Sequence, residues 1–222
     1  MPYYIFEGPD GAGKSTAIDI VADSLTALGC TVYKYAMPGS TKLGQHIRKL
    51  VKTPHHIDES ITINDPVTRQ LLYAADYSAT MHDINAVLAK EPDCVVLADR
   101  CSAISSRIYG EADGADVGTL GPIYDAIPAP QANIMFVLLA DPTETSKRMS
   151  GRPEDYFDQK NEEFKRKITQ SYYRLANTSY HPMYLKVAKY LISIDATEPI
   201  YQCSKTVVDS IVYDLRKIQI IP

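Results

Sequence analysis

The stretch from Gly8 to Ser15 limits what this chain can fold into more than any other segment does. An apolar run over residues 3–6 leads towards Gly8, and four residues later Gly13-Lys14-Ser15 completes the pattern G-x-x-x-x-G-K-[ST]. Apolar side chains then recur at the spacing of a helix, at Ile18, Val21, Ala22, Leu25 and Leu28. A buried strand, this loop and an amphipathic helix, in that order, are the setting of a phosphate-binding P-loop.

The chemistry of such a loop follows from its residue types. Glycines let the backbone approach phosphate oxygens closely, and the exposed N–H groups and the helix N-terminus both favour an anion. Lys14 is expected to reach the β- and γ-phosphates, and the Ser15 hydroxyl to bind Mg²⁺. A glycine-rich turn without this role is the alternative, but the bare pattern arises by chance in fewer than about one chain in a hundred of this length. The loop therefore predicts binding of a nucleoside triphosphate with Mg²⁺.

Composition narrows the class of protein. The chain has 222 residues, of which 45% are hydrophobic and 23% are charged, as expected for one globular domain with a sizeable core. Its net charge of −4 argues against nucleic acid as a partner. The four cysteines lack CxxC spacing and are interpreted as small buried thiols. No signal peptide precedes the P-loop and no apolar run is as long as a membrane span, so we expect a cytoplasmic protein.

Strand-like and helix-like patterns alternate along the chain. Strands are expected at residues 3–7, 31–35, 94–98, 134–139 and 190–194. Helices are expected at residues 15–28, 43–51, 67–90, 142–149, from 158 or 161 to 177, and 200–218. Between residues 101 and 130 we expect a helix, a flexible stretch from Gly110 to Gly121, and a helix to Ile127. Because each strand is a continuous apolar run between helices, the pattern predicts a five-stranded parallel α/β sheet covered on both faces, in a single domain over residues 1–222.

Two groups of charged residues are expected near the P-loop. Asp99-Arg100 ends the third predicted strand, at the sheet edge where open α/β sheets bind ligands. A carboxylate there can hold Mg²⁺ through water or orient an attacking group, and the arginine can hold a second phosphate. Lys147, Arg148 and Arg152 follow the fourth strand, where a closing lid would bring cations to a migrating phosphoryl group. A solvated basic loop accounts for this second group equally well.

Segments from end to end of the chain are similar to those of thymidylate kinases. The segments that carry the resemblance are Phe6–Ser15, Pro38–Thr41, Leu43–Arg48, Leu71–Asp76, Asp99-Arg100, Asp155–Asp158 and Asp195–Thr197. Their order and spacing together are more specific than any one of them. The resemblance implies a P-loop kinase fold with a short lid at about residues 147–157, and a homodimer packed through the helices near residues 43–51 and 66–90.

The resemblance also implies roles for single residues. It implies ATP binding by Gly8, Asp10, Gly11, Ala12, Gly13, Lys14, Ser15, Thr16, Arg148 and Ala196. It implies binding of the acceptor nucleotide by Asp10, Arg48, Tyr73, Tyr77, Arg100, Ser105 and Tyr109. The catalytic residues would be Lys14, Asp99, Arg100 and Arg152, and Ser15 and Asp99 would serve Mg²⁺. Asp10 would bind the sugar 3′-hydroxyl, and Tyr73 would stack on the base.

The chain departs from the family pattern around the acceptor. Ala36-Met37-Pro38 stands where the family has Arg-Glu-Pro, and Tyr77 stands where an arginine usually reads the thymine edge. Further departures are Cys101, Ile108, Tyr109 and Tyr156. These changes are compatible with phosphoryl transfer, and they predict looser or shifted selectivity towards dUMP, its 5-substituted analogues or dCMP.

The leading hypothesis is transfer of the γ-phosphoryl group of ATP to a deoxynucleoside monophosphate, foremost dTMP. A kinase for another or modified pyrimidine nucleotide is a close alternative. Deoxynucleoside kinases are a second one, although they carry Glu-Arg-Ser where this chain has Asp99-Arg100-Cys101. A regulatory P-loop protein is the non-enzymatic alternative, and the chain has no guanine-reading Asn-Lys-x-Asp.

Overall fold

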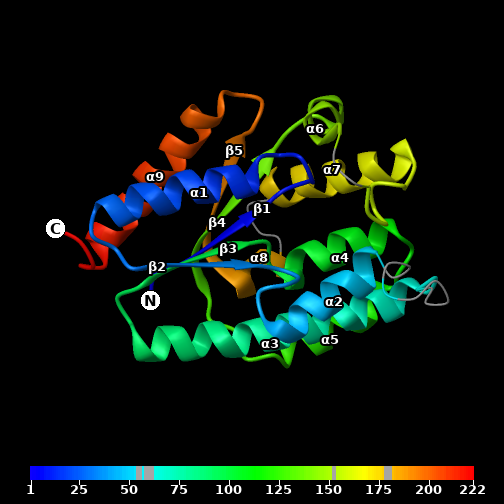
Figure 1. Ribbon diagram of the computed structural model, residues 1–222, viewed down its shortest axis with the longest axis horizontal. Coiled ribbons are helices and arrows are strands. Elements are labelled where there is room, and N and C mark those ends of the chain that lie inside the picture. The colour runs from blue at the N-terminus through cyan, green and yellow to red at the C-terminus, as the bar shows by residue number, and fades with distance from the viewer. Residues whose placement is uncertain (54–56, 58–62, 152–153, 178–181) are drawn as a thin grey trace.

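The sheet brings the ends of its central strands to the P-loop. The computed structural model describes residues 1–53, 57, 63–151, 154–177 and 182–222. Its five strands are β1 (Tyr3–Glu7), β2 (Val32–Ala36), β3 (Val95–Asp99), β4 (Ala132–Leu139) and β5 (Ala188–Asp195). All pair in parallel, in the order β2-β3-β1-β4-β5. The predicted five-stranded parallel sheet is confirmed (Figure 1).

Alternate residues of the central strands feed two separate cores. Tyr4 and Phe6 of β1 face helices α1 (Lys14–Ala27) and α9 (Ile200–Lys217), whereas Tyr3 and Ile5 face the opposite layer. That layer contains the helices α3 (Pro66–Lys90), α4 (Ser102–Ala112) and α7 (Glu162–Asn177). Side chains alternate along a strand with a period of two, so burial of both faces requires the continuous apolar runs seen in the sequence.

Side-chain caps fix the starts of three helices. Asp65 accepts hydrogen bonds from the backbone N–H groups of Val67 and Thr68 at the start of α3. Asp141 does the same for Thr143 in α6 (Pro142–Met149). The start of α7 is fixed by Asn161 and not by Asp158, because the Asn161 side chain accepts from the Phe164 N–H at 2.9 Å. A side-chain acceptor satisfies N–H groups that lack a partner within the helix.

One prediction about local structure was wrong, one helix was missed, and the two edge strands are more exposed than the central strands. The stretch from Gly110 to Gly121 is not a flexible loop, because α4 continues to Ala112 and α5 covers Val117–Asp125. Two glycines and an internal proline hid the helical pattern of α5. The six-residue α8 (Pro182–Val187) was not predicted at all, and so short a helix leaves little periodicity. Strands β2 and β5 are the sheet edges and are partly exposed, not buried on both faces.

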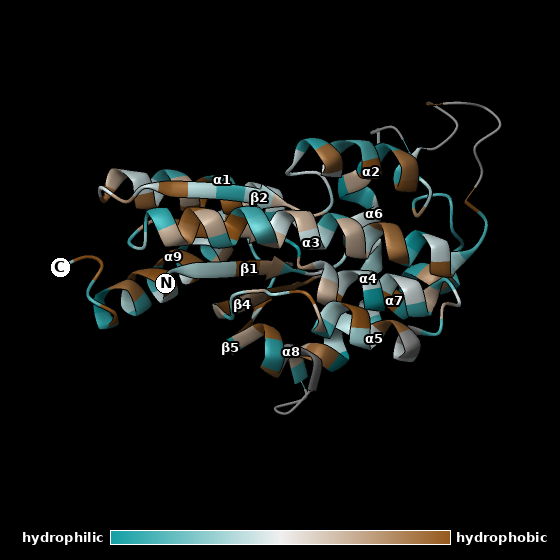
Figure 2. Cartoon of the chain, turned by 90° about the horizontal axis from the view of Figure 1, so that it is seen from below, coloured by the Kyte–Doolittle hydropathy of each residue, from teal (hydrophilic) through white to brown (hydrophobic). Residues whose placement is uncertain are grey.

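The remaining helix, α2 (Lys42–Lys52), lies against α3 and close to the P-loop side of the sheet (Figures 1 and 2). The sequence between α2 and α3, with His55 and His56, is expected to form an irregular loop, and these two residues lie outside the described ones. Within the described part of the chain, no helix combines the length and the hydropathy needed to cross a membrane.

Candidate active site

The loop between β1 and α1 has a backbone that favours glycine, because Gly8, Gly11 and Gly13 all have positive φ. Gly8 has φ of 140°, and a Cβ there would lie 2.3 Å from the Leu138 carbonyl oxygen. Gly13 has φ of 90° and forms the N-cap of α1, with no side chain capping the helix. The first N–H groups of α1 therefore remain available for an anion at the mouth of the loop.

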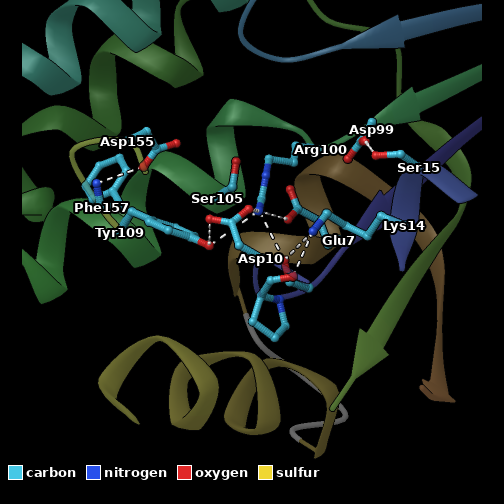
Figure 3. Close-up of polar contacts among 12 residues, drawn as sticks. Glu7, Asp10, Lys14, Ser15, Asp99, Arg100, Ser105, Tyr109, Asp155 and Phe157 are labelled. Atoms are coloured by element: carbon cyan, nitrogen blue, oxygen red, sulfur yellow. Dashed lines mark hydrogen bonds and ion pairs between the residues drawn. The ribbon is translucent and has the colours of Figure 1, made fainter. Parts of the chain in front are cut away.

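The Lys14 amine lies inside the curve of this loop. Its Nζ donates to the carbonyl oxygens of Gly8 at 3.0 Å and Pro9 at 2.8 Å (Figure 3). Burial lowers the pKa of Lys14 to about 8, and the nearby positive charge of Arg100 acts in the same direction. Lys14 is therefore a buried cation in a loop shaped for phosphate, and its charge is sensitive to pH in the mildly alkaline range.

Ser15 and Asp99 meet across the ends of α1 and β3. The Ser15 hydroxyl donates to Asp99 Oδ2 at 2.7 Å (Figure 3). Both are hard oxygen donors, and both line the cavity that contains Lys14. Mg²⁺ is bound in such sites by one or two protein oxygens together with water and substrate phosphates. The donor set therefore fits Mg²⁺.

Arg100 is the centre of the hydrogen-bond network. It has φ of 75°, which is uncommon for a residue other than glycine and is concentrated at functional sites. Its guanidinium donates to Asp10 at 2.6 Å, to the Tyr172 hydroxyl at 3.0 Å and to the Gly8 carbonyl at 3.1 Å. The Tyr109 hydroxyl lies 3.3 Å from the same group (Figure 3). Four residues from three parts of the fold, the P-loop, α4 and α7, thus hold one arginine in a fixed orientation.

Two carboxylates beside Arg100 have opposite pKa shifts. Burial opposes ionisation of Asp10, but Arg100 and then Lys14 outweigh it and hold the pKa of Asp10 below its usual range. Glu7 is fully buried, and burial raises its pKa even though Arg100 lies 3.7 Å away. Asp10 is therefore a fixed negative charge at the site. Glu7 accepts from the Cys101 N–H and the Tyr172 hydroxyl, so it positions the segment after β3.

Two cavities meet at Arg100. The larger, of about 1400 Å³, contains the P-loop, and the smaller, of about 370 Å³, lies beside α4. Predicted site residues that line the larger cavity are Asp10, Gly11, Gly13, Lys14, Ser15, Thr16, Arg48, Asp99, Arg100 and Arg148. Predicted acceptor residues that line the smaller one are Asp10, Tyr73, Arg100, Ser105 and Tyr109. Asp10, Lys52 and Arg100 line both cavities.

Tyr77 lies elsewhere, and this corrects its predicted place at the base edge. Its ring packs against Tyr124, with ring centroids 5.6 Å apart, and its hydroxyl contacts Cys101 Sγ at 3.8 Å. It does not line the smaller cavity, because it turns towards a separate groove on the far side of α4. The longer side chain of an arginine at position 77 could extend beyond Cys101 towards the acceptor cavity. The rigid phenol of Tyr77 packs into the core instead.

Three other predicted site residues line neither cavity, and a fourth lies outside the residues that the structure describes. Ala196 is buried and donates its N–H to the Leu139 carbonyl, so only its neighbours in the loop after β5 can face a ligand. Gly8 and Ala12 shape the P-loop from behind, without lining either cavity. Arg152 lies outside the described residues.

Several residues at the site were missed by sequence reasoning. Lys52 lines both cavities and pairs with Asp155 at 2.5 Å, and it stands one turn after Arg48 on the same face of α2. That i, i+4 spacing of two cations was a usable signal. Phe157 lines the smaller cavity, with its ring 5.1 Å from that of Tyr109. Glu7 was also missed, although a charged residue at the end of an apolar strand indicates a functional position.

The segment after α6 is attached to α2 and α3. The Tyr156 N–H donates to the Lys52 carbonyl at 3.1 Å. The Arg69 guanidinium lies over the Tyr156 ring, 3.4 Å from its centroid, in a cation–π contact. Lys160 pairs with Asp113 at the end of α4. Residues 154–160 are thus fixed to the helices that carry Lys52 and Tyr109.

Comparison with known proteins places this site in a family. A sequence model described as thymidylate kinase matches residues 6–205. The chain is 32% identical to a thymidylate kinase of Pelotomaculum thermopropionicum over 178 residues, which are 78% of this chain and 79% of that protein. It is 34% identical to one of Bacillus licheniformis over 66% of this chain and 67% of that one, and 25% identical to one of a Thermoanaerobacter species over 92% and 94%. The chain belongs to the thymidylate kinase family.

Proposed function

We propose that this protein transfers the γ-phosphoryl group of ATP to dTMP, which gives dTDP and ADP. Besides family membership, the observation that carries the proposal is the junction of the two cavities at Arg100. The P-loop cavity suits a nucleoside triphosphate, and the smaller cavity, floored by Tyr73, suits a flat base. Their shared wall of Asp10, Lys52 and Arg100 is where a donor and an acceptor phosphate would meet.

The charged residues at this junction have distinct roles in the proposal. Lys14 holds the β- and γ-phosphates, while Arg48, Lys52 and Arg100 neutralise the acceptor phosphate as it attacks. Phosphoryl transfer depends mainly on positioning and on stabilising charge spread over the migrating group. Because Arg100 is held by four neighbours, its charge requires no reorganisation when the transition state forms. Arg152 and Arg148 would add charge from the segment at residues 147–157, acting as a lid.

We assign Mg²⁺ to the pair of Ser15 and Asp99. Ser15 would hold the ion directly, and Asp99 would hold it through water, as the 2.7 Å hydrogen bond between them suggests. When bound, the ion neutralises phosphate charge and orients the β- and γ-phosphates. Ser15→Ala and Asp99→Asn should each raise the Mg²⁺ concentration needed for half-maximal rate. Unchanged dependence on Mg²⁺ in both variants would contradict the assignment.

The base is read by small hydroxyls in this proposal. Ser102, Ser105 and Ser106 line the smaller cavity, opposite Tyr73. The Ser105 and Ser106 hydroxyls already donate to the Cys101 and Ser102 carbonyls, so they can accept from a base, unlike the fixed donating fork of an arginine. Tyr109 is assigned to the sugar, because its hydroxyl donates to Asp10 at 3.0 Å. We therefore expect dTMP to be accepted with only about 10–200-fold discrimination against dUMP, its 5-substituted analogues or dCMP, the range typical of shape-based selection.

An ADP-release assay with a panel of acceptors tests the function. We expect ADP release that requires a deoxynucleoside monophosphate, with the highest kcat/KM for dTMP or a close pyrimidine analogue. Turnover with deoxynucleosides in place of monophosphates would indicate a deoxynucleoside kinase. ADP release without any acceptor would indicate an ATPase, and binding without turnover a regulatory protein.

We also propose a homodimer through α2 and α3 and a cytoplasmic location, as in the family. Leu43, Val67 and Leu71 on these two helices are exposed apolar side chains, which supports an interface there. Light scattering should give twice the chain mass, and Leu71→Glu should halve it. Cell fractionation tests the location.

A further inference from the structure

A second large cavity lies away from the P-loop. It is a groove of about 1380 Å³ bounded by α4, α5, α8 and residues 127–130. It shares no lining residue with the P-loop cavity or with the smaller acceptor cavity. In volume it matches the P-loop cavity, so it can hold a ligand of nucleotide size.

The charge of this groove is opposite to that of the whole chain. Its charged lining residues are Arg107, Lys186 and Asp125, which sum to +1 in a protein of net charge −4. Asp125 is already paired with Lys186 at 2.6 Å, and the hydrogen bond from Lys186 lowers the pKa of Asp125. The groove therefore presents an excess of positive charge, which favours an anion.

Arg107 has unused capacity to bind such an anion. Its Nη2 donates to the Gly121 carbonyl at 3.2 Å, and its guanidinium lies 5.6 Å from the Tyr124 ring centroid. Its Nε is buried without a hydrogen-bond partner, and among the described residues no carboxylate lies within ion-pair distance of it, although its charge helps to lower the pKa of Asp125. A planar, half-buried guanidinium matches the geometry of a phosphate or a carboxylate, and a second cation, Lys186, in the same groove favours the more highly charged phosphate.

The groove is one contact away from the acceptor cavity. Tyr124 lines the groove, and its hydroxyl makes a short hydrogen bond with the Ser106 hydroxyl. Ser106 lines the acceptor cavity. Tyr77 joins the same wall, since its ring packs on Tyr124 and its hydroxyl contacts Cys101, directly after Arg100. Any shift of the two tyrosine rings therefore moves groups that face the acceptor.

We propose that this groove is a second binding site, specific for a small phosphate-bearing molecule, which acts on the acceptor cavity through Tyr124 and Ser106. The phosphate is held by Arg107 and Lys186. The apolar part of the ligand lies along Ile127, Pro122 and Pro130. Binding at the groove is independent of the proposed function, whereas the effect on the acceptor rests on it.

The first test is a count of sites. The active site is filled with one equivalent of adenosine and thymidine joined 5′ to 5′ through five phosphates, which should occupy both catalytic cavities. Inorganic phosphate, dTTP and acetate are then titrated separately by calorimetry. We expect phosphate or dTTP, or both, to bind at one further site. Tighter binding of dTTP would show that the nucleoside contributes. No further binding, or equal binding of acetate, would overturn the proposal.

The second test locates the site. Arg107→Ala should weaken this further binding by at least about tenfold, because a charge-assisted hydrogen bond contributes about 1.5–3 kcal/mol. Lys186→Ala should weaken it less, because Lys186 is more exposed and shares its charge with Asp125. Lys205→Ala removes a comparable exposed lysine on α9 and serves as the control. Arg107→Lys tests whether charge alone suffices. Unchanged binding in Arg107→Ala would overturn the assignment to this groove.

The third test concerns the coupling. In the wild type, phosphate or dTTP at the groove should change KM for the acceptor. Tyr124→Phe keeps the ring but removes the bond to Ser106, so the ligand should still bind while KM stops responding. A full response in Tyr124→Phe would overturn the proposed route. If the protein has no kinase activity, calorimetry alone still decides whether the site exists.

Discussion

The phosphate end and the base end of the site are built from different kinds of group. At the phosphate end, the backbone around Gly8 leaves no space for a side chain, and Arg100 is fixed by four hydrogen-bond partners. At the base end, Ser102, Ser105 and Ser106 present hydroxyls on one helix. Rigid charge is what phosphoryl transfer requires, whereas a base needs only a matching shape and edge. Mutations at the two ends should therefore differ in kind as well as in size.

The largest effect is expected at Lys14. Lys14→Ala removes a buried cation from the loop, and loss of one such electrostatic contact typically lowers the rate by about 10²–10³-fold. The fold should persist, since the amine bonds only to the Gly8 and Pro9 carbonyls. ADP release measured beside thermal unfolding separates the two effects, with Lys205→Ala as control. Near-normal turnover in Lys14→Ala would remove the basis of the kinase proposal.

A smaller effect is expected at the base end, and it distinguishes two tyrosines on α3. Tyr73→Ala removes the stacking ring from the acceptor cavity, and base stacking contributes about 1–3 kcal/mol, so KM for dTMP should rise by about 5–150-fold. Tyr77→Phe removes only a weak contact to Cys101 and should change kcat/KM by less than about twofold. Both variants are compared on dTMP, dUMP and dCMP. A changed base preference in Tyr77→Phe would show that the Tyr77 hydroxyl does contact the edge of the base.

The difference between the two ends also explains which parts of the fold and the site could be predicted from the sequence. The sheet, the P-loop and the junction at Asp99-Arg100 were predictable, because strand periodicity and a fixed spacing of residue types determine them. The place of Tyr77 was not, because a helix position fixes where a side chain starts and packing with Tyr124 decides where it ends. The role of Lys52 was also missed, because its pairing with Asp155 joins residues 103 positions apart.

The phosphate end should also respond to pH. ATP phosphates favour the charged amine of Lys14, whose pKa is lowered to about 8 by burial. Above that pH the amine must take up a proton when ATP binds, so kcat/KM for ATP should fall by up to about tenfold per pH unit. Lys14→Arg, which stays charged, should show a flat profile between pH 7.5 and about 9.5 even if its rate is lower. A decline of the same shape in both proteins would assign the titration to another group.

The last effect concerns stability and not activity, and it is expected at Asp76 of α3. Asp76 Oδ1 accepts from the Gly39 N–H at 3.0 Å and holds the loop that Arg48 also contacts, while Oδ2 is buried without a partner among the described residues. Burial raises the pKa of Asp76 to about 6 from an ordinary 3.8. The folded state therefore binds more protons than the unfolded state in this window, so the free energy of unfolding should fall as pH rises from about 4 to about 6.

Asn at this position keeps the hydrogen bond to Gly39 and cannot ionise. Asp76→Asn should raise the free energy of unfolding well above pH 6 by up to about 3 kcal/mol, since the pKa shift from 3.8 to about 6 corresponds to about 1.4 kcal/mol per unit. It should leave stability near pH 4 almost unchanged, which a general packing effect would not do. Urea unfolding at pH 4.5, 6 and about 7.5 measures the difference, with Asp209→Asn on the exposed face of α9 as the control. Equal stabilisation at every pH would contradict the raised pKa of Asp76, because it would show that burial does not disfavour the charged carboxylate.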